Sequence, residues 1–151
     1  MNLGLQSYEG AFDIIHGRLI TTGIKDYRSL IAQIAQILRP SGLMLLSECD
    51  IQSYDDEKRL LLPFPVGHPQ HTALAAFQKL IRDSVRARGG DADAPGKLAE
   101  WARSVPSFID VRAEDLWIST WPRLGPGTFD EDSETTPFPI CTLQTIQTIL
   151  A

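Results

Sequence analysis

The sequence predicts an α/β fold built around a strand, a helix and a second strand near its N-terminus. Three observations support this prediction. Phe12 to Ile15 is a short apolar stretch, and Leu43 to Ser47 begins as an apolar run without polar alternation, which is typical of a strand covered on both faces. Between them, apolar residues recur at the spacing of one helical face: Leu30, Ile31, Ile34, Ile37 and Leu38.

The helix between these strands has recognisable ends. Asp26 or Ser29 can cap its first turn, and the Pro-Ser-Gly of the segment LRPSG stops it, so the predicted helix spans about Tyr27 to Leu38. A strand, an amphipathic helix and a strand within this length form a βαβ unit. The two strands should therefore be adjacent and parallel, with a right-handed crossover.

Two further helices are expected after a loop from Gln52 to Pro69. The first places Leu74, Phe77, Ile81 and Val85 inward. Its end carries three basic residues that complement the helix dipole: Arg82, Arg86 and Arg88. The next helix has Leu98, Trp101, Ala102 and Val105 on its apolar face and ends at Pro106.

The C-terminal part is predicted to change character. Phe108 to Val111 and Leu116 to Thr120 read as extended segments, which places the end of the partial domain near residue 121. Residues 122–151 begin rich in Pro, Gly, Thr and acid, which indicates a loop-rich or disordered tail. Cys141 to Leu150 is interpreted as a possible short terminal helix.

Composition narrows the function. The chain has 151 residues and a formal net charge of -5, which argues against a general nucleic-acid binder. No run approaches the ~20 apolar residues of a membrane span. Two cysteines are too few for a disulfide framework or a zinc site, so a reduced, cytoplasmic protein is expected.

The carboxyl ends of the two predicted parallel strands form the expected ligand edge. His16, Gly17 and Arg18 follow the first strand, and Glu48 and Asp50 follow the second. A histidine or a glutamate here could take a proton from a bound ligand, so His16 and Glu48 are the candidate catalytic residues. The alternative is structural: Arg18 pairs with a carboxylate, His16 fills the strand end, and the acids are solvated.

Other polar and aromatic residues carry weaker signals. Trp121 could contact a ligand, whereas Trp101 is expected in the core. His68 and His71 have the spacing of a metal pair but lack a third ligand, so no metal site is predicted. Cys49 has no histidine placed beside it and is not expected to be a nucleophile.

Roughly the first four-fifths of the chain, with its central motif near the N-terminus, resembles the class I S-adenosylmethionine-dependent methyltransferases, in particular the fungal small-molecule branch. In that family a strand of the type F-D-x-[IV]-H-x-R precedes a helix, then L-[KR]-P-G-G, then a strand ending in Glu. The matching residues of the first element are Phe12, Asp13, His16 and Arg18. Those of the second are Leu38, Arg39, Pro40 and Gly42, with Ser41 in place of a glycine and Glu48 ending the strand.

The resemblance implies a cofactor and a set of site residues. S-adenosylmethionine would contact His16, Gly17 and Arg18, and a small-molecule methyl acceptor would contact Glu48, Asp50 and Trp121. The family's GxGxG loop lies upstream of the FDIIH strand, and the sequence contains no GxGxG. A partial Rossmann-like methyltransferase sheet that lacks the N-terminal cofactor-binding half is therefore expected.

Two functional hypotheses follow. One is a truncated methyltransferase homologue, weakly active or inactive as this chain. The other is a non-catalytic remnant or interaction fragment. In either case the first strand would have an unpaired apolar edge, through which the chain could self-associate.

Overall fold

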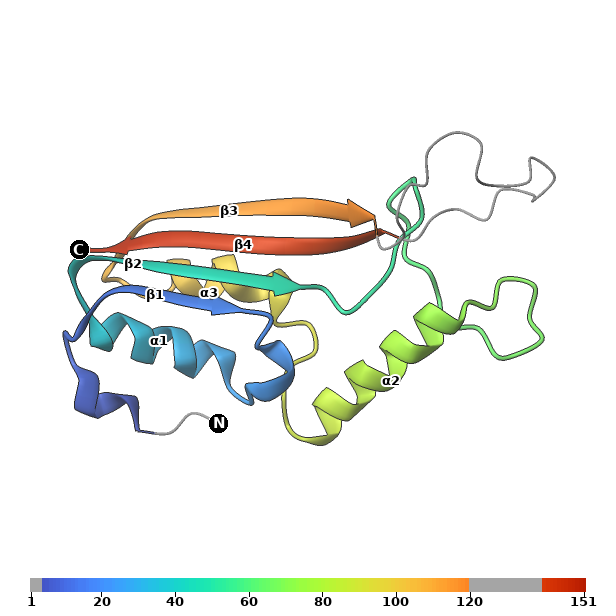
Figure 1. Cartoon of the computed structure of the whole chain (residues 1–151), viewed down its shortest axis with the longest axis horizontal. Coiled ribbons are helices and arrows are strands. Elements are labelled where there is room, and N and C mark those ends of the chain that lie inside the picture. The colour runs from blue at the N-terminus through green and yellow to red at the C-terminus, as the bar shows by residue number, and fades with distance from the viewer. Residues whose placement is uncertain (1–3, 120–139) are drawn as a thin grey trace.

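The computed structural model describes residues 4–119 and 140–151. Within them, a four-stranded sheet has the order β1-β2-β4-β3 (Figure 1). Its strands are β1 (Phe12–Arg18), β2 (Leu38–Cys49), β3 (Phe108–Ser119) and β4 (Ile140–Leu150). The helices are α1 (Tyr27–Ile37), α2 (Ala73–Ala87) and α3 (Leu98–Arg103). Short 3₁₀ segments are η1 (Leu5–Tyr8), η2 (Thr21–Gly23) and η3 (Pro95–Lys97).

The predicted βαβ unit is confirmed. β1 pairs parallel with β2, and the register aligns Ile15 with Met44 and Arg18 with Ser47. Helix α1 joins the two strands, and the side chain of Asp26 caps it by accepting a hydrogen bond of 2.8 Å from the backbone N–H of Ser29. Both strands extend further than the apolar stretches suggest, because backbone pairing continues into polar residues at their ends.

The turn from α1 into β2 requires glycine at position 42. A Cβ atom there would lie 2.7 Å from the carbonyl oxygen of Arg39 and 3.2 Å from that of Asp13. Neither backbone atom can move without disturbing the strands. The LRPSG segment thus ends the helix at Ile37 and begins β2 at once, with Gly42 allowing close approach of β1.

The C-terminal segment corrects one prediction. Ile140–Leu150 is strand β4, not a terminal helix, and it lies between β2 and β3, antiparallel to both. Its side chains alternate: Ile146 and Thr148 are fully buried, whereas Gln147 between them is exposed. The Thr- and Ile-rich sequence suits this pleated environment, which a local pattern does not reveal. The predicted tail from 122 to 139 lies outside the described residues.

The two extended segments predicted near the third helix form one strand. β3 runs continuously from Phe108 to Ser119, with its register against β4 shifting between Ile109 and Arg112. Asp110 has a φ of 54° at this point, as expected for a β-bulge. The bulge therefore lies within the first predicted segment. The polar residues between the two segments, Arg112 to Asp115, pair regularly with β4 and continue the strand.

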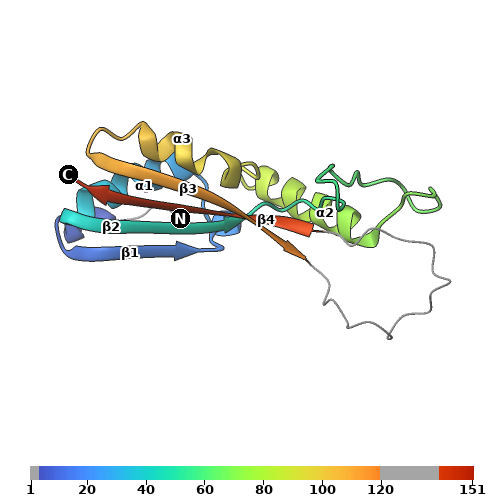
Figure 2. The same ribbon diagram turned by 90° about the horizontal axis from the view of Figure 1, so that it is seen from above.

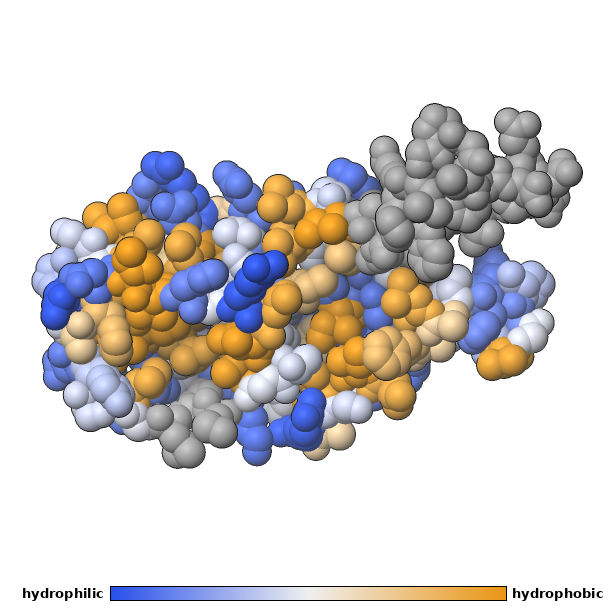
Figure 3. Space-filling model, in the orientation of Figure 1, coloured by the Kyte–Doolittle hydropathy of each residue, from blue (hydrophilic) through white to orange (hydrophobic). Residues whose placement is uncertain are grey.

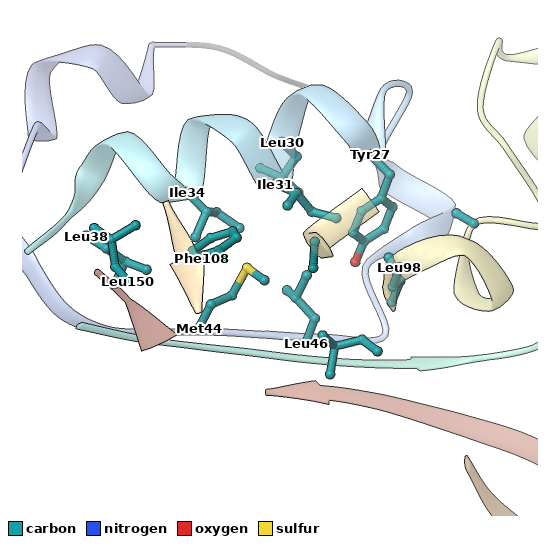
Figure 4. Close-up of a cluster of buried hydrophobic side chains, with 13 residues drawn as sticks. Tyr27, Leu30, Ile31, Ile34, Leu38, Met44, Leu46, Leu98, Phe108 and Leu150 are labelled. Atoms are coloured by element: carbon teal, nitrogen blue, oxygen red, sulfur yellow. The ribbon is translucent and has the colours of Figure 1, made fainter. Parts of the chain in front are cut away.

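Helices α1 and α3 cover one face of the sheet, and the core lies between them and the strands (Figure 4). Ile31, Met44, Leu46, Leu98 and Ile146 are fully buried there. Ile34, expected in the core, is 3% exposed. Trp101 packs against this cluster and stacks on Tyr27, with ring centroids 6.4 Å apart, as its helical position predicted.

Within the described residues, no helix covers the opposite face of the sheet (Figure 2). Ile14 at its edge is 61% exposed, and Ile109, Leu116 and Ile118 on β3 are between 44% and 50% exposed. β1 is an edge strand, as expected. In the space-filling view, hydrophobic residues gather over the region of β1 and α1 (Figure 3).

Helix α2 differs from its prediction in what it buries. Phe77, expected inward, is 58% exposed, and the buried residues are Ala75, Arg82 and Val85. The helix lies beyond the carboxyl ends of β1 and β2 rather than against a face of the sheet (Figure 1). Only a narrow strip of its surface is therefore buried against the rest of the chain. Arg82 is buried in ion pairs, so it does not merely complement the helix dipole at the surface.

Candidate functional site

β1, β2 and β3 all end at the edge of the sheet where β4 begins (Figure 1). This edge carries the residues that the sequence singled out. His16 and Arg18 are exposed, on the face of the sheet opposite α1, because side chains alternate along a strand. Gly17 points the other way, and a Cβ there would lie 2.8 Å from Cδ2 of Leu46. Packing alone therefore favours glycine at this position.

An apolar groove of about 350 Å³ runs along β1 on the α1 side. It is lined by Leu5 from η1, Ile15 and His16 from β1, and Leu30 and Ile34 from α1, among others. No carboxylate is among the described residues that line it. The groove could accept a flat apolar group, but it offers no acid to hold sugar hydroxyls.

Glu48 is the most constrained polar residue at this edge. Its side chain is 1% exposed, and its two carboxylate oxygens accept four hydrogen bonds. Oε1 accepts from the backbone N–H of Ile20 at 2.9 Å and from the hydroxyl of Tyr27 at 2.7 Å. Oε2 accepts from the backbone N–H and the hydroxyl of Thr21 at 3.2 and 2.8 Å. Glu48 thus ties the turn after β1 to the first residue of α1.

This geometry bears on the sequence-based role of Glu48. Because β2 alternates, Glu48 faces α1, whereas His16 lies on the opposite face of the sheet. The two candidate catalytic residues are therefore not brought together. Burial, together with the Glu48 carboxylate, raises the pKa of Tyr27 well above its ordinary value, so the phenol keeps the proton that it donates.

Asp50 organises a second polar cluster just beyond β2. It accepts hydrogen bonds from the hydroxyl of Tyr54 at 2.5 Å and from Nε2 of Gln52 at 3.1 Å. The guanidinium of Arg82 lies 3.6 Å from its Oδ1 and also contacts Asp93. Burial and the hydrogen bond to Asp50 raise the pKa of Tyr54 to about 12. The cluster therefore joins the loop after β2 to α2.

Several other predicted roles can be placed. Burial, and then the neighbouring Cys141, raise the pKa of the Cys49 thiol to about 12, so it is protonated at neutral pH and a poor nucleophile. Nδ1 of His71 is 2.7 Å from the carbonyl oxygen of Phe64, and the His68 ring stacks on the Phe64 ring. Among residues 4–119 and 140–151 no group of three ligating side chains could hold a metal. Trp121 lies outside the described residues.

Sequence reasoning missed the partners of these acids. Thr21 and Tyr27 donate hydrogen bonds to Glu48 across 27 and 21 positions of sequence. Arg82, on α2, forms an ion pair with Asp50 in the loop after β2. No local pattern reports such contacts. The one signal in the sequence was a charged residue at the end of a buried strand, because a buried charge requires hydrogen-bonding or ion-pair partners.

A parallel βαβ unit extended by the antiparallel strands β4 and β3 is an arrangement of the Rossmann-like methyltransferase class. Solved structures of two S-adenosylmethionine-dependent enzyme complexes share it. Phosphoethanolamine N-methyltransferase 2 from Haemonchus contortus, in complex with phosphomonomethylethanolamine and S-adenosylhomocysteine, superposes with a TM-score of 0.53 at 12% identity. That match covers 94% of this chain and 34% of the other, and the same enzyme with S-adenosyl-L-methionine also gives 0.53.

The family follows from the sequence comparison. Residues 4–86 match the methyltransferase domain family, and the chain belongs to it. The secondary metabolism regulator laeA of Coprinopsis cinerea is 40% identical over 124 residues, which cover 81% of this chain and 30% of that protein. The methyltransferase grgD of a Penicillium species is 22% identical over 108 residues, 70% of this chain and 34% of that protein. The chain thus spans about a third of the length of these relatives. No helix in the described part is long and apolar enough to cross a membrane.

Proposed function

We propose that this chain supplies the acceptor-facing half of an S-adenosylmethionine-dependent methyltransferase that acts on a small molecule. One observation carries the proposal. The carboxyl ends of the parallel strands β1 and β2 bring the loop after His16-Gly17-Arg18 and the Asp50 cluster to one edge of the sheet. In open α/β sheets, this edge is where ligands bind.

The described residues fit the cofactor only in part. The apolar groove beside β1 could receive a flat ring, and His16 borders it. However, none of the described residues that line the groove is a carboxylate, and a Cβ at position 17 would meet Leu46 of this chain. The sequence also contains no GxGxG segment. Residues beyond this chain's own would have to complete the cofactor site.

Within such a complete site, the tasks of this chain's residues are positional. Glu48 holds the turn from Ile20 to Thr21 and thereby fixes the loop that leaves β1. Arg82 and Tyr54 hold Asp50 in place at the end of β2. The cofactor would supply the methyl group, and this half would orient the acceptor, since correct placement of two reactants accounts for much of such a reaction's acceleration.

The test is calorimetric titration of the full chain with S-adenosylmethionine. A missing charged hydrogen-bonding partner costs about 1.5–3 kcal/mol, and each ~1.4 kcal/mol is tenfold in affinity. With the glycine loop and the ribose-binding acid both absent, we expect binding no tighter than millimolar and no methyl transfer. An in-frame fusion to a segment carrying the acidic-GxGxG loop should restore binding, and the same fusion with its glycines replaced should not. Micromolar affinity of the unfused chain would overturn the proposal.

A second candidate function rests on the uncovered sheet. The exposed Ile14 and the open edge of β1 offer backbone pairing and apolar contact to another chain. A non-catalytic fragment that binds a partner would do so through this lateral edge of β1. It would be favoured if the fusion described above folds and still fails to bind the cofactor.

A further inference from the structure

A small cavity lies where β2 and β3 end and β4 begins, on the side of the sheet that faces η3. Its volume is about 240 Å³, the size of a small polar headgroup rather than of a nucleotide. Its polar and aromatic lining consists of Asp50, Tyr54, Asp115, Trp117, Thr142 and Gln144. The apolar groove beside β1 is lined by different residues, so the two sites are distinct.

Two carboxylates give this cavity a negative character. The Asp50 side chain is 22% exposed and is only partly neutralised, because Arg82 lies 3.6 Å from it and also contacts Asp93 and the carbonyl oxygen of Ala92. Asp115 is exposed and accepts a hydrogen bond of 2.9 Å from Nε2 of Gln144. The cavity therefore favours a cation over an anion.

The amide of Gln144 adds an unused acceptor. Because its Nε2 donates to Asp115, its Oε1 is left to accept, and this buried atom has no hydrogen-bond partner among the described residues. Buried polar atoms in native proteins are ordinarily paired, so an orphaned acceptor beside a cavity indicates a missing donor. An N–H or O–H group of a ligand would supply it.

The aromatic residues of the lining are suited to the same kind of ligand. The rings of Tyr54 and Trp117 meet edge to face, with centroids 5.2 Å apart. The Nζ of Lys58 lies 4.8 Å from the centroid of the Trp117 ring. The indole face thus already attracts one of the protein's own cations, which is the interaction that recognises alkylammonium ligands.

We propose that this cavity binds a small organic ammonium group, with the Asp50 and Asp115 carboxylates opposite its charge and the Trp117 ring against its alkyl substituents. An ammonium with a free N–H would also donate to Oε1 of Gln144. The idea that this group is part of the methyl acceptor rests on the proposed function. Binding itself requires neither the cofactor nor methyl transfer, so the two can fail separately.

The test uses the full chain without cofactor and a matched pair of ligands. Choline is titrated against the ¹⁵N-labelled protein, in parallel with 3,3-dimethylbutan-1-ol, its neutral carbon isostere. We expect saturable shifts of the Trp117 indole N–H and of the Gln144 side-chain amide with choline alone. The Trp117 signal is assigned by its loss in Trp117→Leu.

Three substitutions sharpen the test, with one control. Asp115→Asn and Trp117→Leu should each weaken choline binding by about tenfold, as expected for loss of one charged or aromatic contact. Lys58→Ala should strengthen it, because the competing cation leaves the indole face. Asp13→Asn removes another exposed carboxylate, which pairs with Arg39 at the other end of β1, and should change nothing.

Two results from the unfused chain would overturn the inference. One is equal binding of choline and its neutral isostere, which would mean that charge is not recognised. The other is choline affinity unchanged by Asp115→Asn, an exposed substitution that leaves the core intact. Restored cofactor binding in the fusion without any choline binding would refute this inference and leave the proposed function standing.

Discussion

Replacing Glu48 by glutamine tests whether this residue is structural, because the substitution keeps its shape and removes its charge. Each carboxylate oxygen accepts from one backbone N–H, that of Ile20 on Oε1 and that of Thr21 on Oε2. An amide has only one oxygen. Whichever way the amide of Glu48→Gln is turned, its NH₂ group must face one of these backbone donors. The hydroxyls of Thr21 and Tyr27 can rotate, but the backbone N–H groups cannot.

The expected loss follows from this count. One buried N–H left unsatisfied costs about 1–3 kcal/mol, and the remaining hydrogen bonds lose the assistance of a charge. We therefore expect the free energy of unfolding to fall by at least about 1–3 kcal/mol. Urea unfolding of the full chain measures this as a lower midpoint at an unchanged slope.

The control is Glu114→Gln, which changes an exposed carboxylate on β3 and should stay within about 0.5 kcal/mol of the parent. Tyr27→Phe provides a second measure, since it removes only the 2.7 Å hydrogen bond to Oε1. If Glu48→Gln is as stable as Glu114→Gln, the four-bond arrangement does not stabilise the fold. Glu48 would then be free for the acid-base role that the sequence first suggested.

Three further predictions concern the core, an ion pair and the sheet edge. Ile34→Ala should cost about 2–5 kcal/mol in urea unfolding, whereas Ile14→Ala, at a 61% exposed position, should cost far less; equal losses would remove α1 from the core. Burial alone would raise the pKa of Asp93, but Arg82 and Arg86 outweigh it and lower that pKa. The stability that the ionised Asp93 contributes is present above its unfolded pKa of about 3.9 and is lost as the pH falls through the lower folded pKa. Below about pH 5, Asp93→Asn should therefore show a flatter dependence of the unfolding free energy on pH than the parent. Ile14→Lys should abolish any concentration dependence in sedimentation velocity, because a charge at an exposed edge opposes strand pairing; a parent that is already monomeric at every concentration would contradict edge association.

The periodicity of the N-terminal half was enough to predict its fold. A βαβ unit follows from the apolar runs of β1 and β2 and the helical spacing from Leu30 to Ile37. An amphipathic helix between two apolar strands is the usual crossover connection of a parallel pair. The same reading failed for Ile140–Leu150, which became a central strand. Its apolar and Thr residues fit a helix or a strand, and only the neighbouring edges of β2 and β3 decide between them.

The site shows the same division. The sequence placed His16, Glu48 and Asp50 at the ends of predicted strands, and the parallel register does bring these strand ends to one edge. It could not show that Glu48 faces α1 with four donors around it while His16 faces the other side of the sheet. That difference depends on the alternation of each strand and on residues more than 20 positions away.

The sequence by itself therefore determined the family, the βαβ unit and the edge at which ligands would bind, because each is encoded in local spacing or in contiguous motifs. Only the tertiary structure decided the place of β4, the burial of Arg82, and the cavity lined by Asp50, Asp115 and Trp117. Those features arise where segments far apart in the chain meet. Their energies depend on distance, burial and the orientation of donors, which no local pattern of residues records.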